Sequence, residues 1–495
     1  MNKTPIGLIA LALAIFILPA AADVPNVKLD PESAVTTEHA VTVKGQRIPY
    51  RATAGTLPVW NDEGRAIASV FYVYYERTDI KDQSRRPLFI SFNGGPGSSS
   101  VWMHLGYTGP RNLIIDDEGH PVQPYGIRDN PHSIIDIADI VFVDPVNTGF
   151  SRILGDADRS LFFGVNEDIE YLARWIESFV TRRERWRSPK FLIGESYGTT
   201  RVSGLAAQLQ EAHRMFLNGV ILVSPTSLGI ERGGPVAAAL HLPYFTAAAW
   251  YHKVLPSDLQ AQDLDDLLPQ VETWTLDVFL PALARGGFLE DGRRREIAMT
   301  VARYSGLSEQ VVLNNNLDVP TSLFWKELLR DKGLTIGRLD SRYRGIDRDD
   351  GGIIRDYDPA MASWNHSFTP AINHYLREVL GYKTDLSYNI FGMVRPWNRM
   401  GDRTGENLRQ AMAQNPYLRV MIQSGYFDGG TDYFSAKYTM WQLDPSGKLR
   451  DRLRFEGYRS GHMMYLRKED LAVSNEHIRE FVRDALPPSG VPAKY

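Results

Sequence analysis

Apolar residues follow two different periods along the first half of the chain. Four short runs are almost continuously apolar, as expected for strands buried on both faces of a sheet. These runs are residues 87–92, 138–144, 190–193 and 219–224. Apolar residues also recur at helical spacing from Ile169 to Val180, and residues 199–212 predict a second helix. This alternation predicts an α/β fold with a mostly parallel central sheet flanked by helices.

The segments that border this pattern predict antiparallel strands and the start of a helix. Residues 40–50 alternate between apolar and polar side chains, and a second run extends over residues 66–75. Together they predict strands joined in hairpins. Asn166 is the predicted N-cap of the first long helix. Glu167 and Asp168 follow it in the first turn, where the helix dipole favours negative charge.

The alternation of strands and helices is lost over residues 229–405, where we expect mostly helical pieces. Strand-like runs and a final helix return afterwards, at residues 418–423, 453–456 and 475–485. We therefore predict one α/β core made of residues 23–228 and 406–495. Residues 229–405 would form a largely helical cap inserted between these two parts.

The amino terminus has the pattern of a secretory signal peptide. Lys3 precedes an apolar run over residues 6–18, and small residues follow at Ala20 and Ala22. A membrane anchor is the alternative, but the run is short for a span of about 20 residues. We predict that residues 1–22 are a signal peptide, that the protein is exported to the periplasm or the medium, and that no stable membrane anchor remains.

The amino-acid composition argues against several classes of function. The chain has 495 residues, a formal net charge of −4 and no cysteine. A cysteine nucleophile, a disulfide and a thiolate metal site are therefore impossible. Nucleic-acid binding is not expected, because it needs a concentrated basic surface. No metal site and no cofactor is predicted.

A candidate nucleophile lies between a predicted strand and a predicted helix. Residues 194–198 read Gly-Glu-Ser-Tyr-Gly and match the G-x-S-x-G elbow, in which a sharp turn exposes the serine. A serine hydroxyl is a poor nucleophile by itself and needs a histidine base that is held by a carboxylate. The strand before Ser196 and the helix after it raise this short motif above chance.

The predicted partners of Ser196 follow later strands in the order Asp, His. Asp428 comes after the strand that ends near residue 423, and His462 comes after the next strand. Asp432 is the main rival for the acidic position. With Ser196, these residues predict a catalytic triad on an α/β-hydrolase fold.

A glycine-rich loop completes the catalytic pattern. Acyl transfer needs backbone N–H groups that are fixed to receive the developing oxyanion. One donor normally comes from the residue after the nucleophile, here Tyr197, and the other from a glycine-rich loop after an earlier strand. Residues 93–97, Asn-Gly-Gly-Pro-Gly, form such a loop after the strand at residues 87–92.

Several motifs together resemble the serine carboxypeptidase family. The matching segments, in the family order, are FNGGPGSSS at residues 92–100, DPVNTGFS at 144–151, FLIGESYG at 191–198, SGYFD at 424–428 and GHM at 461–463. The resemblance implies a serine-type carboxypeptidase that removes single residues from peptide carboxyl termini. It also implies that Ser196, Asp428 and His462 are catalytic and that the backbones of Gly95 and Tyr197 form the oxyanion hole.

The same resemblance implies a site for the substrate's terminal carboxylate. Asn93, Gly94 and Glu195 would bind it, with Glu195 protonated because two carboxylates would repel. The chain departs from the family at Tyr107, where a second glutamate is usual, and at Met464-Tyr465, where proline normally follows. These departures suggest a divergent, bacterial-type member.

Two other functions are compatible with these residues. An esterase or an acyltransferase would use the same triad, since a fold does not fix the substrate. A non-catalytic binding protein could keep the fold, but it would not need all three triad residues.

Overall fold

The computed structural model describes residues 30–492 and 494–495, and the predicted signal peptide lies outside them. The centre is a ten-stranded sheet with the order β1-β2-β3-β7-β4-β9-β10-β13-β14, and β8 pairs with β3. Its strands are β1 (Ser33–Val43), β2 (Gln46–Trp60), β3 (Ala66–Arg77), β4 (Leu88–Phe92), β7 (Asp139–Val143), β8 (Arg152–Ile153), β9 (Lys190–Glu195), β10 (Gly219–Val223), β13 (Arg419–Gly425) and β14 (Leu453–Tyr458). The strands from β7 to β14 run parallel, which confirms the predicted fold class.

Helices cover both faces of the sheet, and alternate residues of each strand pack against opposite layers. In β9, Phe191 and Ile193 belong to one hydrophobic core with residues of α1 (Val101–Gly106), α12 (Pro359–His374) and α15 (Lys468–Ala485). Leu192 belongs to the core on the other face. That core includes residues of α2 (Val165–Arg182), α3 (Tyr197–Glu211), α13 (Thr404–Gln414) and α14 (Tyr433–Leu443). The almost continuous apolar runs in the sequence reflect this burial on two sides.

The prediction for the start of α2 was wrong by two residues. Gly164 is the N-cap, and Asn166 lies inside the first turn instead of before it. Glu167 and Asp168 still occupy that turn, as the dipole favours. The final helix α15 also begins at Lys468, earlier than its predicted start at residue 475.

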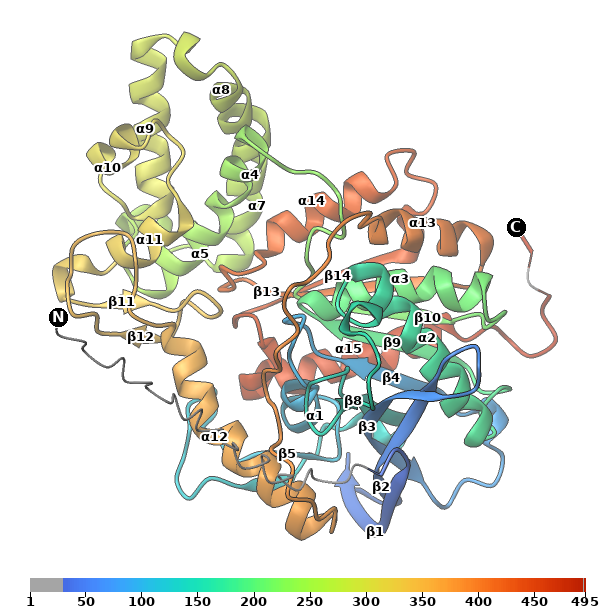
Figure 1. Cartoon of the computed structure of the whole chain (residues 1–495). Helices are drawn as coiled ribbons and strands as arrows, with labels where there is room; N and C mark the ends of the chain where they lie inside the picture. The colour runs from blue at the N-terminus through green and yellow to red at the C-terminus, as the bar shows by residue number, and fades with distance from the viewer. Residues whose placement is uncertain (1–29, 493) are drawn as a thin grey trace, which may run out of the picture.

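The first part of the segment between β10 and β13 forms a helical lobe. Figure 1 shows α4 to α11 (green to yellow) together, away from the sheet, while α12 (orange) extends along the core. The lobe contains α4 (Pro235–Leu240), α5 (Leu242–Tyr251), α6 (Ser257–Gln260), α7 (Leu264–Trp274), α8 (Leu280–Ala284), α9 (Asp291–Ser305), α10 (Glu309–Asn314) and α11 (Thr321–Glu327). It has a hydrophobic core of its own, in which Phe245 of α5 stacks on Phe324 of α11.

After this lobe the chain returns to the sheet. β13 pairs in parallel with β10, so the two parts of the chain share one sheet. The boundaries at residues 228 and 405 stay a prediction. Among the described residues, none of the helices is both long and apolar enough to cross a membrane.

Candidate active site

Ser196 lies on a strained turn between β9 and α3. Its φ of 57° is in the left-handed region that residues with side chains rarely adopt. A Cβ at Gly198 would lie 2.8 Å from the Phe92 carbonyl oxygen, and a Cβ at Gly194 would collide with the Gly198 carbonyl. Gly194 therefore lets β9 and α3 meet closely, and Gly198 lets α3 approach the end of β4. The strain exposes the serine at the end of the strand, as the elbow motif predicts.

Ser196 and His462 line the same pocket, which has a volume of about 250 Å³. Gly94, Gly95 and Glu195 line it as well. Among the described residues, Ser196 and His462 are not joined by a hydrogen bond, as is common for catalytic contacts before substrate binds. The pocket brings the predicted nucleophile and base together from segments far apart in sequence.

Asp428 holds the other side of the imidazole. Its Oδ2 lies 2.7 Å from His462 Nδ1, and both side chains are buried. The backbone N–H groups of Gly430 and Thr431 donate to Asp428 Oδ1 at 2.8 and 3.1 Å. Thr431 Oγ1 lies 2.8 Å from Asp428 Oδ2. The carboxylate is therefore fixed by its own turn and aimed at Nδ1, which leaves Nε2 for the substrate side.

Asp432, the sequence-level rival, has a different role. Its Oδ1 accepts a hydrogen bond of 2.8 Å from Ser435 N at the start of α14, so it caps that helix. Its Oδ2 lies 3.1 Å from His241 Nδ1. The geometry therefore pairs His462 with Asp428.

Burial and the charge of Asp428 shift the pKa of His462 in opposite directions. Burial by itself lowers the histidine's pKa, but the charge and hydrogen bond of Asp428, together with the nearby Glu195, raise it above the ordinary value. The carboxylate thus stabilises the imidazolium that a proton transfer from Ser196 would form.

The glycine-rich loop lies directly against the elbow. A Cβ on Gly94 would collide with the backbone nitrogen of Tyr197, so the loop approaches this closely only because residue 94 is glycine. Gly95 has a φ of 105°. Tyr197 is the first residue of α3, where a backbone N–H has no acceptor within its helix. The predicted oxyanion donors Gly95 and Tyr197 thus belong to two adjoining segments.

Arg201, which sequence reasoning missed, holds this loop in place. Its guanidinium donates to the carbonyl oxygens of Asn93 at 2.7 Å and Pro96 at 3.3 Å. A buried ion pair with Asp168 of α2, 2.7 Å long, orients the guanidinium. No local motif marks Arg201, because its partners come from two other segments.

Glu195 is buried beside the nucleophile, and both of its carboxyl oxygens have donors. Asn93 Nδ2 donates to Oε1 at 3.0 Å, and the Tyr465 hydroxyl donates to Oε2. Burial raises the pKa of Glu195 to about 7, helped by the charge of Asp428; His462 and the two hydrogen bonds act in the opposite direction. Glu195 can therefore change its charge near neutral pH.

Asn93 and Gly94, the other predicted carboxylate ligands, lie at different depths. Gly94 lines the pocket. Asn93 is fully buried, and its Oδ1 accepts a hydrogen bond of 3.0 Å from Met103 N while its amide holds Glu195. Asn93 fixes the Glu195 carboxyl group through this buried hydrogen bond. Its role as a direct substrate ligand stays a prediction.

Two tyrosines occupy the region behind Glu195. The rings of Tyr107 and Tyr465 stack with centroids 4.7 Å apart and an interplanar angle of 11°. The Tyr107 hydroxyl donates to Gln423 Oε1 at 2.8 Å, whereas the Tyr465 hydroxyl reaches Glu195. Both positions are the departures noted in the sequence. The hydrogen-bond donor to Glu195 Oε2 is thus the phenol of Tyr465, three residues after His462.

A loop from the helical insertion packs between the two catalytic loops. It joins β11 (Thr335–Ile336) to β12 (Arg344–Gly345), and we call residues 337–343 the β11–β12 loop. Its hydrogen bonds run from His462 N to Leu339 O (2.7 Å), Gly429 N to Arg338 O (2.8 Å), Ser341 N to Phe427 O (2.9 Å) and Gly461 N to Asp340 Oδ2 (3.1 Å). The insertion thereby fixes the loops that carry Asp428 and His462.

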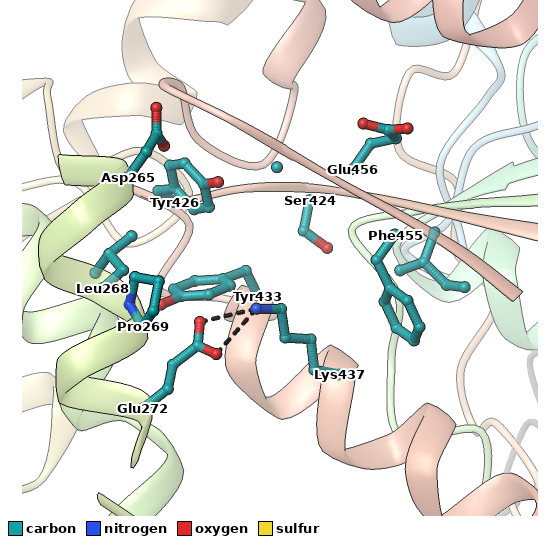
Figure 2. A pocket seen from close by; sticks show the side chains of 12 residues that line it. Asp265, Leu268, Pro269, Glu272, Ser424, Tyr426, Tyr433, Lys437, Phe455 and Glu456 are labelled. Carbon is teal, nitrogen blue, oxygen red and sulfur yellow. Dashed lines mark hydrogen bonds and ion pairs between the residues drawn. The ribbon is translucent and has the colours of Figure 1, made fainter. Parts of the chain in front are cut away.

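A second pocket, of about 220 Å³, shares no lining residue with the first. It lies between α7 of the insertion and β13, β14 and α14 of the core (Figure 2). Glu272 and Lys437 form an ion pair in it, at 2.8 and 3.0 Å. Figure 2 shows the Ser424 hydroxyl pointing into the space beside Tyr433 and Lys437. Within the described residues, no group of three or more His, Asp or Glu side chains is arranged to hold a metal ion.

The fold and the site together define an α/β-hydrolase with a serine, histidine and aspartate arranged around one pocket. A family model described as serine carboxypeptidase matches residues 43–259. The fold is similar to that of a prohormone-processing carboxypeptidase from Saccharomyces cerevisiae, with a TM-score of 0.52 and 15% identity over 88% of this chain and 91% of the other. Over residues 43–259 the chain therefore matches the serine carboxypeptidase family, and the yeast carboxypeptidase shares its fold.

The curated relatives are distant. "Serine carboxypeptidase-like 31" from Arabidopsis thaliana is 27% identical over 201 residues, 37% of this chain and 37% of the relative. "Serine carboxypeptidase-like 27" from the same plant is 26% identical over 396 residues, 78% of this chain and 74% of the relative. The match thus spans little more than a third of the first relative's length. Family and fold support a hydrolase, and the relatives do not fix its substrate.

Proposed function

We propose that this protein is a serine-type carboxypeptidase that hydrolyses the C-terminal peptide bond of peptides through an acyl-enzyme intermediate. The observation that carries the proposal is one pocket that contains Ser196 on a strained turn and His462 held by Asp428. Each member of such a triad has a chemical task that the others cannot perform.

The reaction proceeds in two acyl-transfer steps. His462 Nε2 takes the hydroxyl proton as Ser196 Oγ attacks the scissile carbonyl, and the Gly95 and Tyr197 N–H groups stabilise the oxyanion. His462 then gives this proton to the leaving amine, and the C–N bond breaks. Water, deprotonated by His462, attacks the acyl-enzyme. The peptide acid leaves, and Ser196 regains its proton.

Release of a C-terminal residue requires that the pocket recognise a free carboxylate. Glu195 near Ser196 supports this when it is protonated, because a neutral carboxyl group can donate a hydrogen bond to the substrate. Its pKa of about 7 keeps a large neutral fraction at and below neutral pH. An esterase or acyltransferase does not need to recognise a free carboxylate.

Export is the second part of the proposal. It rests on the sequence pattern of Lys3, the apolar run at residues 6–18, and Ala20 and Ala22. Amino-terminal sequencing of the protein recovered from the producing cells and from their medium tests it. A first residue of Asp23 supports export, whereas retention of residues 1–22 in the cell contradicts it.

The activity is tested with three substrates and two proteins. An N-blocked dipeptide with a free carboxyl end, its carboxyl-amide twin and a simple aryl ester are incubated with wild type and Ser196→Ala across pH. Cleavage of the free acid in preference to its amide, lost in Ser196→Ala, supports the proposal. Turnover of the ester alone would contradict it in favour of an esterase or acyltransferase.

A further inference from the structure

Arg338 is the only lysine or arginine among the described residues that line the catalytic pocket. Its side chain is 45% exposed, and its nearest carboxylate, Asp358, lies 3.8 Å from Nε, beyond hydrogen-bond distance. Asp358 is already used by other donors, because it accepts hydrogen bonds from Leu339 N at 3.4 Å and Ala360 N at 3.0 Å. Within the described residues, the guanidinium thus lines the pocket with only this long ion pair to Asp358.

The backbone of Arg338 is fixed between the catalytic loops. Its carbonyl oxygen accepts from Gly429 N at 2.8 Å, and the next residue, Leu339, accepts from His462 N at 2.7 Å. A Cβ on Gly430 would lie 3.1 Å from Arg338 Nη1, so the guanidinium lies close over the Asp428 turn. Its positive charge also counteracts the rise in the pKa of His462, which is consistent with this proximity.

Apart from His462, the other described residues of the pocket offer a carboxylate only neutral donors. Much of its wall is apolar and consists of Trp102, Leu339, Met361, Trp364, Phe391 and Met463. Glu195 can donate to a substrate carboxylate only when it is protonated, and it repels an anion when it is ionised. A neutral donor does not balance the charge of a carboxylate that loses its hydration in such a pocket. A guanidinium provides one, with a planar set of donors that matches a carboxylate.

We propose that Arg338 binds the free terminal carboxylate of the peptide substrate. This proposal rests on the proposed carboxypeptidase activity and names a charged residue that recognises the peptide end together with protonated Glu195. Arg338 is a substrate-binding residue and takes no part in the proton transfers. The insertion therefore supplies specificity, while the core supplies the triad.

The first test compares Michaelis constants for the free-acid dipeptide and its amide twin. We expect Arg338→Gln to raise KM for the free acid about ten- to a hundredfold, with kcat far less affected. KM for the amide should stay within about twofold, as both substrates share every other contact. Arg338→Lys keeps the charge without the paired donors, so its KM for the free acid should lie between those of wild type and Arg338→Gln. Arg348→Gln is the matched control, since Arg348 is an exposed arginine of the same insertion.

The second test does not depend on peptide hydrolysis. An N-blocked amino acid with a free carboxylate should slow fluorophosphonate labelling of Ser196 in wild type, and its amide should not. Arg338→Gln should lose this protection while its uninhibited labelling rate is kept. If wild type cleaves only esters but shows this protection, the proposed activity is wrong and the role of Arg338 stands. The inference would be overturned if Arg338→Gln changed KM equally for the acid and the amide. It would also be overturned if the variant changed neither KM nor the protection from labelling.

Discussion

The two pockets beside β13 are similar in size and differ in how their polar groups are paired. In the pocket of Figure 2, Lys437 is neutralised by Glu272 at 2.8 and 3.0 Å, and Ser424 lies on a regular strand. In the catalytic pocket, Ser196 has a φ of 57°, and Arg338 lies 3.8 Å from its nearest carboxylate. Volume and residue types alone would not separate them. Backbone strain does, because it costs free energy that a purely structural cavity has no reason to keep, and Arg338 also lacks the close ion pair of Lys437.

The largest expected effect is the difference in kcat between variants of Ser196 in the catalytic pocket and Ser424 in the second pocket. Ser196→Ala should lower kcat for the preferred substrate about 10⁶-fold, the loss typical when a triad serine is removed. Ser424→Ala removes a buried hydroxyl from the other pocket and should leave kcat within about threefold. Steady-state kinetics on both variants measures this, and thermal unfolding verifies that they are folded. A large loss in Ser424→Ala would show that the two pockets act together.

The next largest effect is the difference in kcat between variants of Asp428 and Asp432. Asp428→Asn should lower kcat about 10⁴-fold, because the amide cannot hold His462 in the required tautomer or stabilise its cation. Asp432→Asn should retain activity, since asparagine caps a helix about as well as aspartate. Kinetics of the pair decides the assignment. Comparable losses in both would contradict the role given to Asp428 alone.

The pH dependence of KM for the free acid should differ between variants of the two stacked tyrosines, Tyr465 and Tyr107. Activity should fall as pH drops through the raised pKa of His462, because the protonated imidazole cannot accept the serine proton. KM for the free acid should rise above about pH 7, where Glu195 becomes negative. Tyr465→Phe removes a donor that favours ionised Glu195, so this rise should move about one pH unit higher.

The control for this shift is Tyr107→Phe, which also removes one hydroxyl from the stack but leaves Glu195 untouched. It should keep the wild-type profile, and the amide substrate should show no alkaline rise in KM with any of the three proteins. If both variants move the profile equally, packing of the stack and not the Tyr465 hydrogen bond governs Glu195.

The smallest effect concerns the ion pair in Figure 2. Glu272→Gln should lower the free energy of unfolding by about 1 kcal/mol, because the pair is only partly buried. Activity and KM should not change. Urea denaturation and kinetics measure the two quantities. A change in KM with unchanged stability would indicate that the second pocket communicates with the first.

The meeting of the three candidate triad residues at one pocket could be predicted because each of them follows a strand in a short local motif. Ser196, Asp428 and His462 are placed by the ends of β9, β13 and β14, and the order of parallel strands then brings those ends to one edge. The central sheet was predictable for the same reason, since burial on two faces leaves continuous apolar runs.

The groups that set the environment of the site could not be predicted. Tyr465 looked like a departure from the family, and only the packing of its ring on Tyr107 brings its hydroxyl to Glu195. Arg338 lies in a short hairpin of the insertion, where no periodicity marks it. Their positions depend on contacts between segments distant in sequence, which local pattern does not encode.

The most direct test of the central claim, that Ser196 is the activated nucleophile, is covalent trapping followed by peptide mapping. The wild-type protein is treated with a fluorophosphonate, its intact mass is measured and the modified peptide is sequenced. The account predicts one added phosphonyl group on Ser196, none on Ser196→Ala and unchanged labelling of Ser424→Ala. Absence of labelling in folded wild type, or labelling of another residue, would contradict it.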